Sequence, residues 1–267
     1  MIRSNHNGFR YEGGNEGHYE SYFQRGNHPS RKLAFWIRYT LFSPKGRPRD
    51  AVGELWAIYF DGERRRITPV KVVVPYSRCL FNAWELNARI GDAVLDGSSL
   101  RGSAEVLDHS LAWDLRYTSA EEPLFLLPEG LYDASFPKAK ALVGAPLARF
   151  SGSLVVDGER IAVDDWVGSQ NHNWGVKHTD EYAWGQVAGF DEAPGSFLEV
   201  STARVHLGPI KTPWLSPMVL RHEGREYRWN AIRTAIRAKA HYDFFRWTFD
   251  TRADGARLHG VIEADAS

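Results

Sequence analysis

Apolar and polar residues alternate with a period of two along most of this chain, and turn signals interrupt the alternation at short intervals. That period predicts β-strands with one buried face. Pro44 and Gly46 follow the first long run, and Asp61-Gly62 and Asp157-Gly158 mark two hairpins. The expected strands are 33–42, 53–60, 67–74, 84–90, 99–107, 111–118, 150–156, 160–167, 182–190, 197–207, 218–221, 227–229, 244–249 and 258–262.

This density of short strands predicts an all-β fold, either a sandwich or a barrel. The chain lacks the strand–helix alternation typical of a parallel sheet. Residues 120–147 contain several prolines and predict a long, partly apolar loop, which could serve as a lid or plug over a barrel mouth. Residues 231–240 are ambiguous: their alanines and arginines permit a helix, and Ile232 and Ile236 are about one helical turn apart.

Composition narrows the classes of partner. The chain has 267 residues, 43% of them hydrophobic, with 33 Lys plus Arg balancing 33 Asp plus Glu. Zero net charge gives no electrostatic reason to expect nucleic acid. No run approaches the ~18 apolar residues of a membrane span, and no apolar segment follows the N-terminus, so a cytoplasmic protein without membrane insertion is expected. The lone Cys79 predicts neither an internal disulfide nor a thiolate metal site.

Residues 164–186 combine tryptophans, histidines, acids and glycines more densely than any other segment. Histidines and carboxylates exchange protons, and tryptophans line apolar pockets. The alternatives are that the tryptophans only pack a barrel end and that His172 is a hydrogen-bonded, half-buried side chain. His172 and His178 are six residues apart, which matches neither a helical His pair nor a zinc finger, so no metal site is predicted.

The segment 17–29 forms a second cluster, in which His18, Glu20 and Tyr22 alternate. On a strand, alternate residues share one face, so these three side chains are expected to face the same side. An ordinary first strand explains the pattern equally well.

These clusters carry a resemblance to a known family. His172-Asn173-Trp174-Gly175 followed by Tyr182-Ala183-Trp184-Gly185 resembles the signature of the carotenoid 1,2-hydratase (hydroxyneurosporene synthase) and AttH-like family, and 20–44 is similar to its first hairpin. The resemblance spans 17–263, and tocopherol cyclases and fungal Diels–Alder cyclases look like distant relatives. It implies tandem lipocalin-like (calycin-type) antiparallel β-barrels, here over 1–192 and 193–267. The second stretch is shorter than usual in the family, so its barrel is expected to be short or incomplete, with an open edge that favours a homodimer.

The resemblance also implies a chemistry that needs no redox cofactor or metal. An acid protonates an alkene, aromatic faces stabilise the cation, and water captures it. His172 and Trp174 match the family's His-x-Trp, whereas its Tyr-x-Asp has no identical counterpart. The nearest equivalent, Phe197-Leu198-Glu199, makes Glu199 the expected acid. The rival acids are Asp164, Asp165 and Glu181.

The expected function is therefore to bind a hydrophobic isoprenoid or polyketide-like molecule and to hydrate, cyclise or isomerise it without a cofactor. The alternatives are a non-catalytic carrier on the same fold and a β-sandwich glycosidase or sugar-binding module. The predicted catalytic residues are Glu199, His172 and Asp165. The predicted ligand-binding residues are Trp174, Tyr182, Trp184, Gln186, Asn171, Trp36 and Tyr22.

Overall fold

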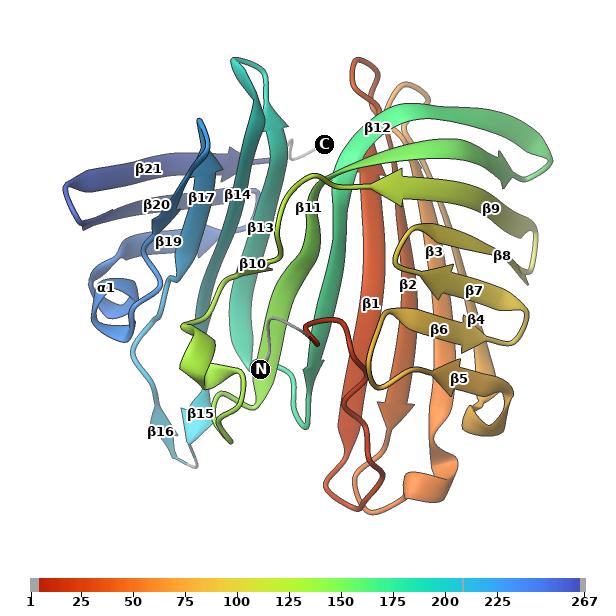
Figure 1. The fold of residues 1–267 in the computed structure, drawn as a ribbon, viewed down its shortest axis with the longest axis horizontal. Helices are drawn as coiled ribbons and strands as arrows, with labels where there is room; N and C mark the ends of the chain where they lie inside the picture. Colours follow the sequence, from red (N-terminus) through yellow and green to blue (C-terminus); the bar gives the residue numbers. More distant parts are fainter. Residues whose placement is uncertain (1–4, 208, 265–267) are drawn as a thin grey trace. The chain divides into compact units, whose positions relative to one another are not determined.

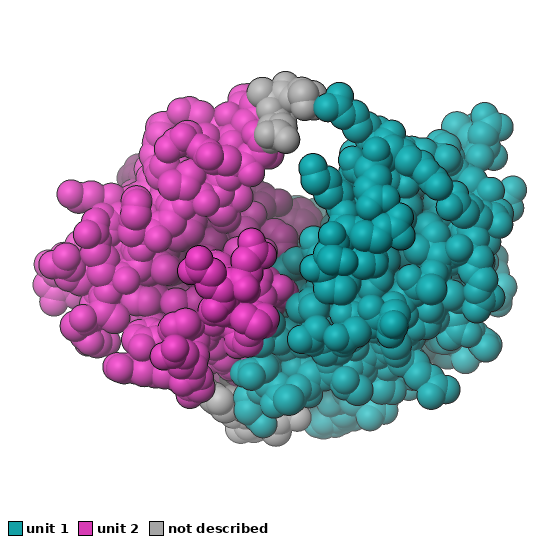
Figure 2. Space-filling model, turned by 90° about the horizontal axis from the view of Figure 1, so that it is seen from above, with its two compact units in different colours: residues 1–123, 140–177 teal, residues 124–139, 178–267 magenta. Residues whose placement is uncertain are grey.

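The computed structural model describes residues 5–207 and 209–264, whose regular elements are nearly all β-strands and form two compact units. Unit 1 comprises Met1–Pro123 and Lys140–Lys177, and unit 2 comprises Leu124–Ala139 and His178–Ser267 (Figure 2). This division differs from the expected boundary at residue 192. The physical reason is that β13 (Glu181–Phe190) forms a hairpin with β14 (Ala193–Arg204), which keeps β13 with the strands that follow it.

Unit 1 contains a nearly closed antiparallel barrel, as the lipocalin-like prediction requires. Its strand order is β4-β3-β2-β1-β12-β11-β9-β8-β7-β6-β5. In Figure 1 the sheet curls on itself, so that β6 and β8 come to face β2, β3 and β4. The strands are β1 (His18–Asn27), β2 (Leu33–Ser43), β3 (Val52–Asp61), β4 (Arg66–Pro75), β5 (Cys79–Phe81), β6 (Asn87–Ile90), β7 (Ala93–Asp96), β8 (Ser99–Val106), β9 (His109–Thr118), β11 (Ala139–Val156) and β12 (Glu159–Gly175).

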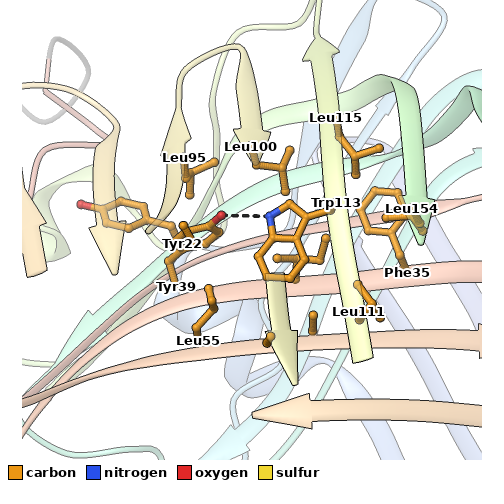
Figure 3. Packing of buried hydrophobic residues seen from close by; sticks show 14 of the residues in the cluster. Tyr22, Phe35, Tyr39, Leu55, Leu95, Leu100, Leu111, Trp113, Leu115 and Leu154 are labelled. Carbon is orange, nitrogen blue, oxygen red and sulfur yellow. Dashed lines mark hydrogen bonds between the residues drawn. The ribbon is translucent and has the colours of Figure 1, made fainter. Parts of the chain in front are cut away.

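Aromatic and branched side chains fill the interior of this barrel (Figure 3). On β2 the alternation seen in the sequence places Phe35, Ile37 and Tyr39 inside, each at most 1% exposed. The indole N–H of Trp113 donates to the Tyr39 hydroxyl at 3.0 Å, and that hydroxyl donates to the Val94 carbonyl at 2.9 Å. The polar atoms that these aromatic residues bring into the core are therefore paired.

Unit 2 has smaller sheets, in line with a reduced second barrel. A four-stranded sheet has the order β13-β14-β17-β18, a three-stranded sheet has the order β19-β20-β21, and β15 pairs with β16. Leu198, Val200, Met218, Trp229, Trp247 and Phe249 form its buried apolar cluster. The remaining elements are β10 (Leu124–Phe125), β15 (His206–Leu207), β16 (Ile210–Lys211), β17 (Met218–His222), β18 (Arg225–Arg228), α1 (Ile232–Arg237), β19 (Lys239–Asp243), β20 (Arg246–Ala253) and β21 (Ala256–Glu263).

Two ambiguous segments take definite forms. The expected loop 120–147 is shorter than predicted, because β11 already begins at Ala139 and continues through Pro146. Residues 231–240 are helical only in part, since α1 ends at Arg237 and β19 starts at Lys239. Three short 3₁₀ turns, at Pro48–Asp50, Tyr76–Arg78 and Glu129–Leu131, complete the described elements. None of the helices in the described ranges has the length and apolar character needed to cross a membrane.

Tyr39→Phe tests the polar pairing inside the barrel. Removing the hydroxyl leaves the buried Trp113 N–H and Val94 carbonyl without their partner, so we expect urea unfolding to show a loss of about 1–3 kcal/mol. Tyr59→Phe is the matched control, because the Tyr59 hydroxyl makes no hydrogen bond to the described residues. Equal stabilities for the two variants would contradict the assignment.

Candidate functional site

Glu20 lies at the centre of a buried polar cluster on the inner face of unit 1. Its carboxylate accepts hydrogen bonds from His172 Nε2 at 2.9 Å and His18 Nε2 at 2.8 Å. The backbone N–H of Arg10 lies 2.9 Å from both carboxylate oxygens. The side chains of Glu20 and His172 are completely buried. Strand pairing creates this cluster, because β1 and β12 align Tyr22 with His172 and thereby bring Glu20 beside it.

Both ring nitrogens of His172 face oxygen atoms that accept hydrogen bonds. Nε2 faces Glu20, and Nδ1 lies 2.9 Å from the backbone carbonyl oxygen of His6. A neutral imidazole carries only one N–H, so it cannot donate to two acceptors at once. The geometry is satisfied when His172 is an imidazolium and Glu20 is a carboxylate.

The electrostatics of Glu20 agree with this proton placement. Burial alone raises the pKa of Glu20, but the hydrogen bonds and charges of His172 and His18 outweigh burial and hold the pKa below its ordinary value. Glu20 is therefore ionised at neutral pH, and its carboxylate accepts the hydrogen bond from His172 Nε2.

Two aromatic rings enclose the imidazolium. The ring centroid of Tyr22 lies 4.3 Å from that of His172, and the centroid of Trp174 lies 4.5 Å from it. Burial raises the pKa of Tyr22 well above its ordinary value, so Tyr22 stays neutral. Aromatic faces attract cations, so these two rings form an environment that suits a positive charge.

A pocket of about 380 Å³ adjoins this cluster in unit 1. Its wall includes His6, whose carbonyl accepts from His172, and Gln170, which is two residues before His172 on the same strand. Asn7 donates to the Gln170 side-chain oxygen at 2.8 Å, and a Cβ at Gly144 would lie only 2.1 Å from that oxygen. The full lining is Asn5, His6, Asn7, Trp84, Glu85, Leu86, Gly97, Tyr117, Ser119, Glu121, Gly144, Ala145 and Gln170.

Three of the predicted site residues in unit 1 lie apart from this cluster. Asp165 is exposed and forms an ion pair with Arg149. It is seven residues from His172 on β12, which is about 23 Å along an extended strand. Asn171 is one residue from His172 and therefore faces the opposite side of β12, where it donates to Ser169 Oγ at 2.9 Å. Trp36 likewise faces away from the inward residues of β2.

The predicted residues of unit 2 form their own group around Glu199. This carboxylate is 2% exposed and accepts from Trp184 Nε1 at 2.7 Å and Gln186 Nε2 at 2.6 Å. Strand pairing aligns Gln186 with Glu199, which puts Gln186, Trp184 and Tyr182 on the same face as the acid. The Tyr182 side chain is 55% exposed.

The rival acids have other roles. Arg204, His206 and Lys211 hydrogen-bond to Glu181 and lower its pKa to about 2, so Glu181 holds no proton at neutral pH. Asp164 is exposed at the surface of β12. Among the described residues, no group of three or more histidine, cysteine or acidic side chains is placed to hold a metal ion.

Sequence reasoning gave Glu20 no role in the site, although it noted that Glu20 alternates with His18 and Tyr22. The alternation correctly indicates that these residues share a face of one strand. The alternation cannot show which strand pairs with this one, because His172 lies 152 residues from Glu20 along the chain.

Comparison with known sequences gives limited information. No protein-family model matches the chain. Two uncharacterized proteins of Mycobacterium tuberculosis, MT0513 and Rv0493c, are each 29% identical to it over 149 residues, which is 55% of this chain. The match spans 44% of the length of these curated relatives.

Comparison with solved structures identifies the fold. A provisionally assigned AttH from Nitrosomonas europaea has a TM-score of 0.58 at 12% identity, covering 88% of this chain and 76% of its own. Kievitone hydratase from Nectria haematococca has a TM-score of 0.59 at 13% identity, with coverages of 88% and 72%. CghA, solved with Sch210972, has a TM-score of 0.55 at 13% identity, with coverages of 93% and 78%. The chain therefore has the lipocalin-like fold of these proteins.

Glu20→Gln tests the buried ion pair. At pH 7 the substitution removes the buried carboxylate to which His172, His18 and the Arg10 backbone donate, and we expect the free energy of unfolding to fall by about 3–5 kcal/mol. Because the pKa of Glu20 is lower in the folded than in the unfolded chain, the stabilisation is complete above about pH 4.3 and is lost as the pH falls through the folded-state pKa.

Urea unfolding of both proteins at several pH values measures this difference. Glu63→Gln is the control, since Glu63 pairs with Arg31 at the surface and should change stability far less. A Glu20→Gln effect that stays constant down to pH 3 would show that the charge of Glu20 is not what stabilises the fold.

Proposed function

We propose that this protein binds an apolar small molecule and transforms it by acid-assisted hydration, cyclisation or isomerisation, without a redox cofactor. The observation that supports the proposal most strongly is the buried His172–Glu20 ion pair, enclosed by Tyr22 and Trp174 beside a pocket. An enclosed proton carrier between aromatic faces is what alkene protonation requires, because the reaction passes through a carbocation.

In the proposed reaction, His172 supplies the proton. The proton on Nδ1 moves to an alkene carbon, the other alkene carbon becomes a cation, and His172 becomes neutral. In hydration, water adds to the cation and its surplus proton returns to Nδ1. In cyclisation or isomerisation, the proton lost from the carbon skeleton returns there instead. Glu20 accepts the Nε2–H throughout and holds the ring in one orientation.

His6 lies between the Nδ1 proton of His172 and the pocket that would hold a ligand. The carbonyl of His6 accepts the hydrogen bond from His172 Nδ1, and His6 also lines the 380 Å³ pocket. A volume of that size falls in the ~300–1,000 Å³ range of small-molecule sites. Movement of His6 would expose the Nδ1 proton to a molecule in the pocket.

Glu199 in unit 2 is the rival acid–base group of this proposal. It occupies the position that the family resemblance assigns to the acid, and it is buried with Trp184 and Gln186 as donors. The Trp184 and Gln186 side chains both donate to its carboxyl oxygens. This arrangement suits a base that removes a proton from a cationic intermediate.

A non-catalytic carrier is the second candidate function. The observation that favours it is the enclosure of His172, whose side chain has no exposed surface and whose two nitrogens are both engaged. A carrier would bind a ligand in the pocket without moving His6, and the ion pair would then act only as part of the barrel wall.

Native mass spectrometry and solvent extraction of the freshly purified protein test binding first. We expect a co-purifying apolar compound, and after its removal we expect the protein to enhance the fluorescence of a hydrophobic dye such as anilinonaphthalene sulfonate. Absence of both would contradict the enzyme and the carrier alike.

Variants then separate catalyst from carrier. With the extracted compound or its precursor as substrate, His172→Gln should reduce turnover by about 10²-fold or more, whereas Asp165→Asn, an exposed acid on the same strand, should leave it unchanged. Loss of turnover in Glu199→Gln but not in His172→Gln would move the chemistry to unit 2. Binding without turnover in the unaltered protein would identify a carrier.

A further inference from the structure

Unit 2 contains a strongly basic cleft that the proposed chemistry does not use. Its volume is about 400 Å³, and it lies between the end of α1 and the neighbouring strands β19, β20 and β21. Its lining carries four cationic side chains and a single acid. The lining residues are Thr234, Arg237, Lys239, Asp250, Thr251, Arg252 and Arg257.

The strand register explains why these charges gather. Arg252 on β20 is directly opposite Arg257 on β21, and Asp250 on β20 is directly opposite Lys239 on β19. Arg237 is the last residue of α1, two positions before Lys239. The cations thus come from one helix end and three adjacent strands, so the fold itself concentrates them.

One acid cannot neutralise this set. Asp250 accepts two hydrogen bonds from Arg257, at 2.9 and 2.7 Å, and this bidentate contact lowers the pKa of Asp250. Arg237, Lys239 and Arg252 are exposed and make no side-chain hydrogen bond or ion pair with the described residues. Three positive charges therefore remain uncompensated within one concave site.

The arrangement is unfavourable without a ligand. Like charges directly opposite each other on neighbouring strands are destabilising, and Arg252 and Arg257 have this relation. Arginine guanidinium groups bind phosphate oxygens in a bidentate manner, and hydroxyl groups such as that of Thr234 add neutral donors. A multiply charged anion would relieve the repulsion, whereas a monocarboxylate would leave most of it.

We propose that this cleft binds the phosphate or diphosphate group of a small molecule. The surplus of three positive charges exceeds the roughly two negative charges of a phosphate ester and is closer to the charge of a diphosphate group. The volume of about 400 Å³ is that of a small-molecule site rather than a single-ion site. The proposal is independent of the chemistry at His172, because all the residues involved belong to unit 2.

Isothermal titration calorimetry of the full-length chain with inorganic diphosphate tests the site, with inorganic phosphate and sulfate titrated at the same ionic strength. We expect saturable 1:1 binding of diphosphate, weaker binding of phosphate, and the weakest binding of sulfate. The double variant Arg237→Gln/Arg252→Gln should weaken diphosphate binding at least tenfold. Arg233→Gln is the matched control, because Arg233 lies on the same helix but does not line the cleft.

The variant is expected to fold, since removing Arg252 relieves a repulsion; its melting temperature should equal or exceed that of the unaltered chain. Diphosphate should raise the melting temperature of the unaltered chain and of Arg233→Gln, but not that of the double variant. Non-saturable heats, equal binding of all three anions, or unchanged diphosphate affinity in the folded double variant would each overturn the proposal.

Discussion

The pairing of β1 with β12 is the constraint on which unit 1 and its candidate site depend. It joins residues near the start of the chain to residues about 150 positions later and sets Tyr22 opposite His172. A slip of one residue would turn every side chain of β1 to the opposite face and separate Glu20 from His172. Two glycines help to prevent that slip. Gly26 pairs with Gly168. A Cβ on Gly168 would lie 1.7 Å from the Arg25 carbonyl oxygen, and a Cβ on Gly26 would lie 2.5 Å from the Phe35 ring, so neither position has room for a side chain.

A buried ion pair in a core rich in aromatic side chains requires an explanation. Removing two charges from water costs several kcal/mol per ion, and an apolar pair of similar volume is often at least as stable. Glu20 offsets this penalty with hydrogen bonds from two histidines and the Arg10 backbone. These contacts offset the cost of burying the two charged groups, but they do not explain why charged groups are there, since apolar side chains fill the adjoining barrel interior. A chemical role for the pair supplies that reason, which is why the proposed function rests on it.

Local patterns in the sequence predict the strands well, because alternation and turn residues are properties of neighbouring positions. The all-β fold, the inward residues of β2 and the turn at Asp157-Gly158 follow from them, and Asp157 indeed adopts a positive φ of 49°. Pro146 was part of the predicted loop 120–147, but β11 continues through it although proline cannot donate a backbone hydrogen bond. The unit boundary is also invisible locally, since it depends on β13 pairing with β14.

The candidate site was only partly predictable for the same reason. The resemblance identified His172 and Trp174, and it identified Trp184 with Glu199, which the structure places in hydrogen-bonding contact. Asp165 was predicted as a rival acid to Glu199, and the structure places it seven residues from His172 along the extended strand β12. Glu20 needed knowledge of strand pairing, and pairing between distant strands leaves no mark in the residues of either strand alone.

The hydrogen bond between His6 and His172 links two properties of the proposed site: whether a ligand in the pocket can reach His172, and how readily His172 releases its Nδ1 proton. While the His6 carbonyl accepts the Nδ1–H, the imidazolium is satisfied on both nitrogens and has no exposed surface. If a ligand displaces His6, the same movement opens the path from the pocket and removes the acceptor that stabilises the Nδ1 proton. Glu20 keeps its own hydrogen bond to Nε2, so the proton that becomes available is the one facing the ligand. In the proposed reaction the backbone at His6 would therefore shield His172 from the pocket and also hold the Nδ1 proton through its carbonyl. Proton transfer from His172 to water would be suppressed until a ligand displaces His6.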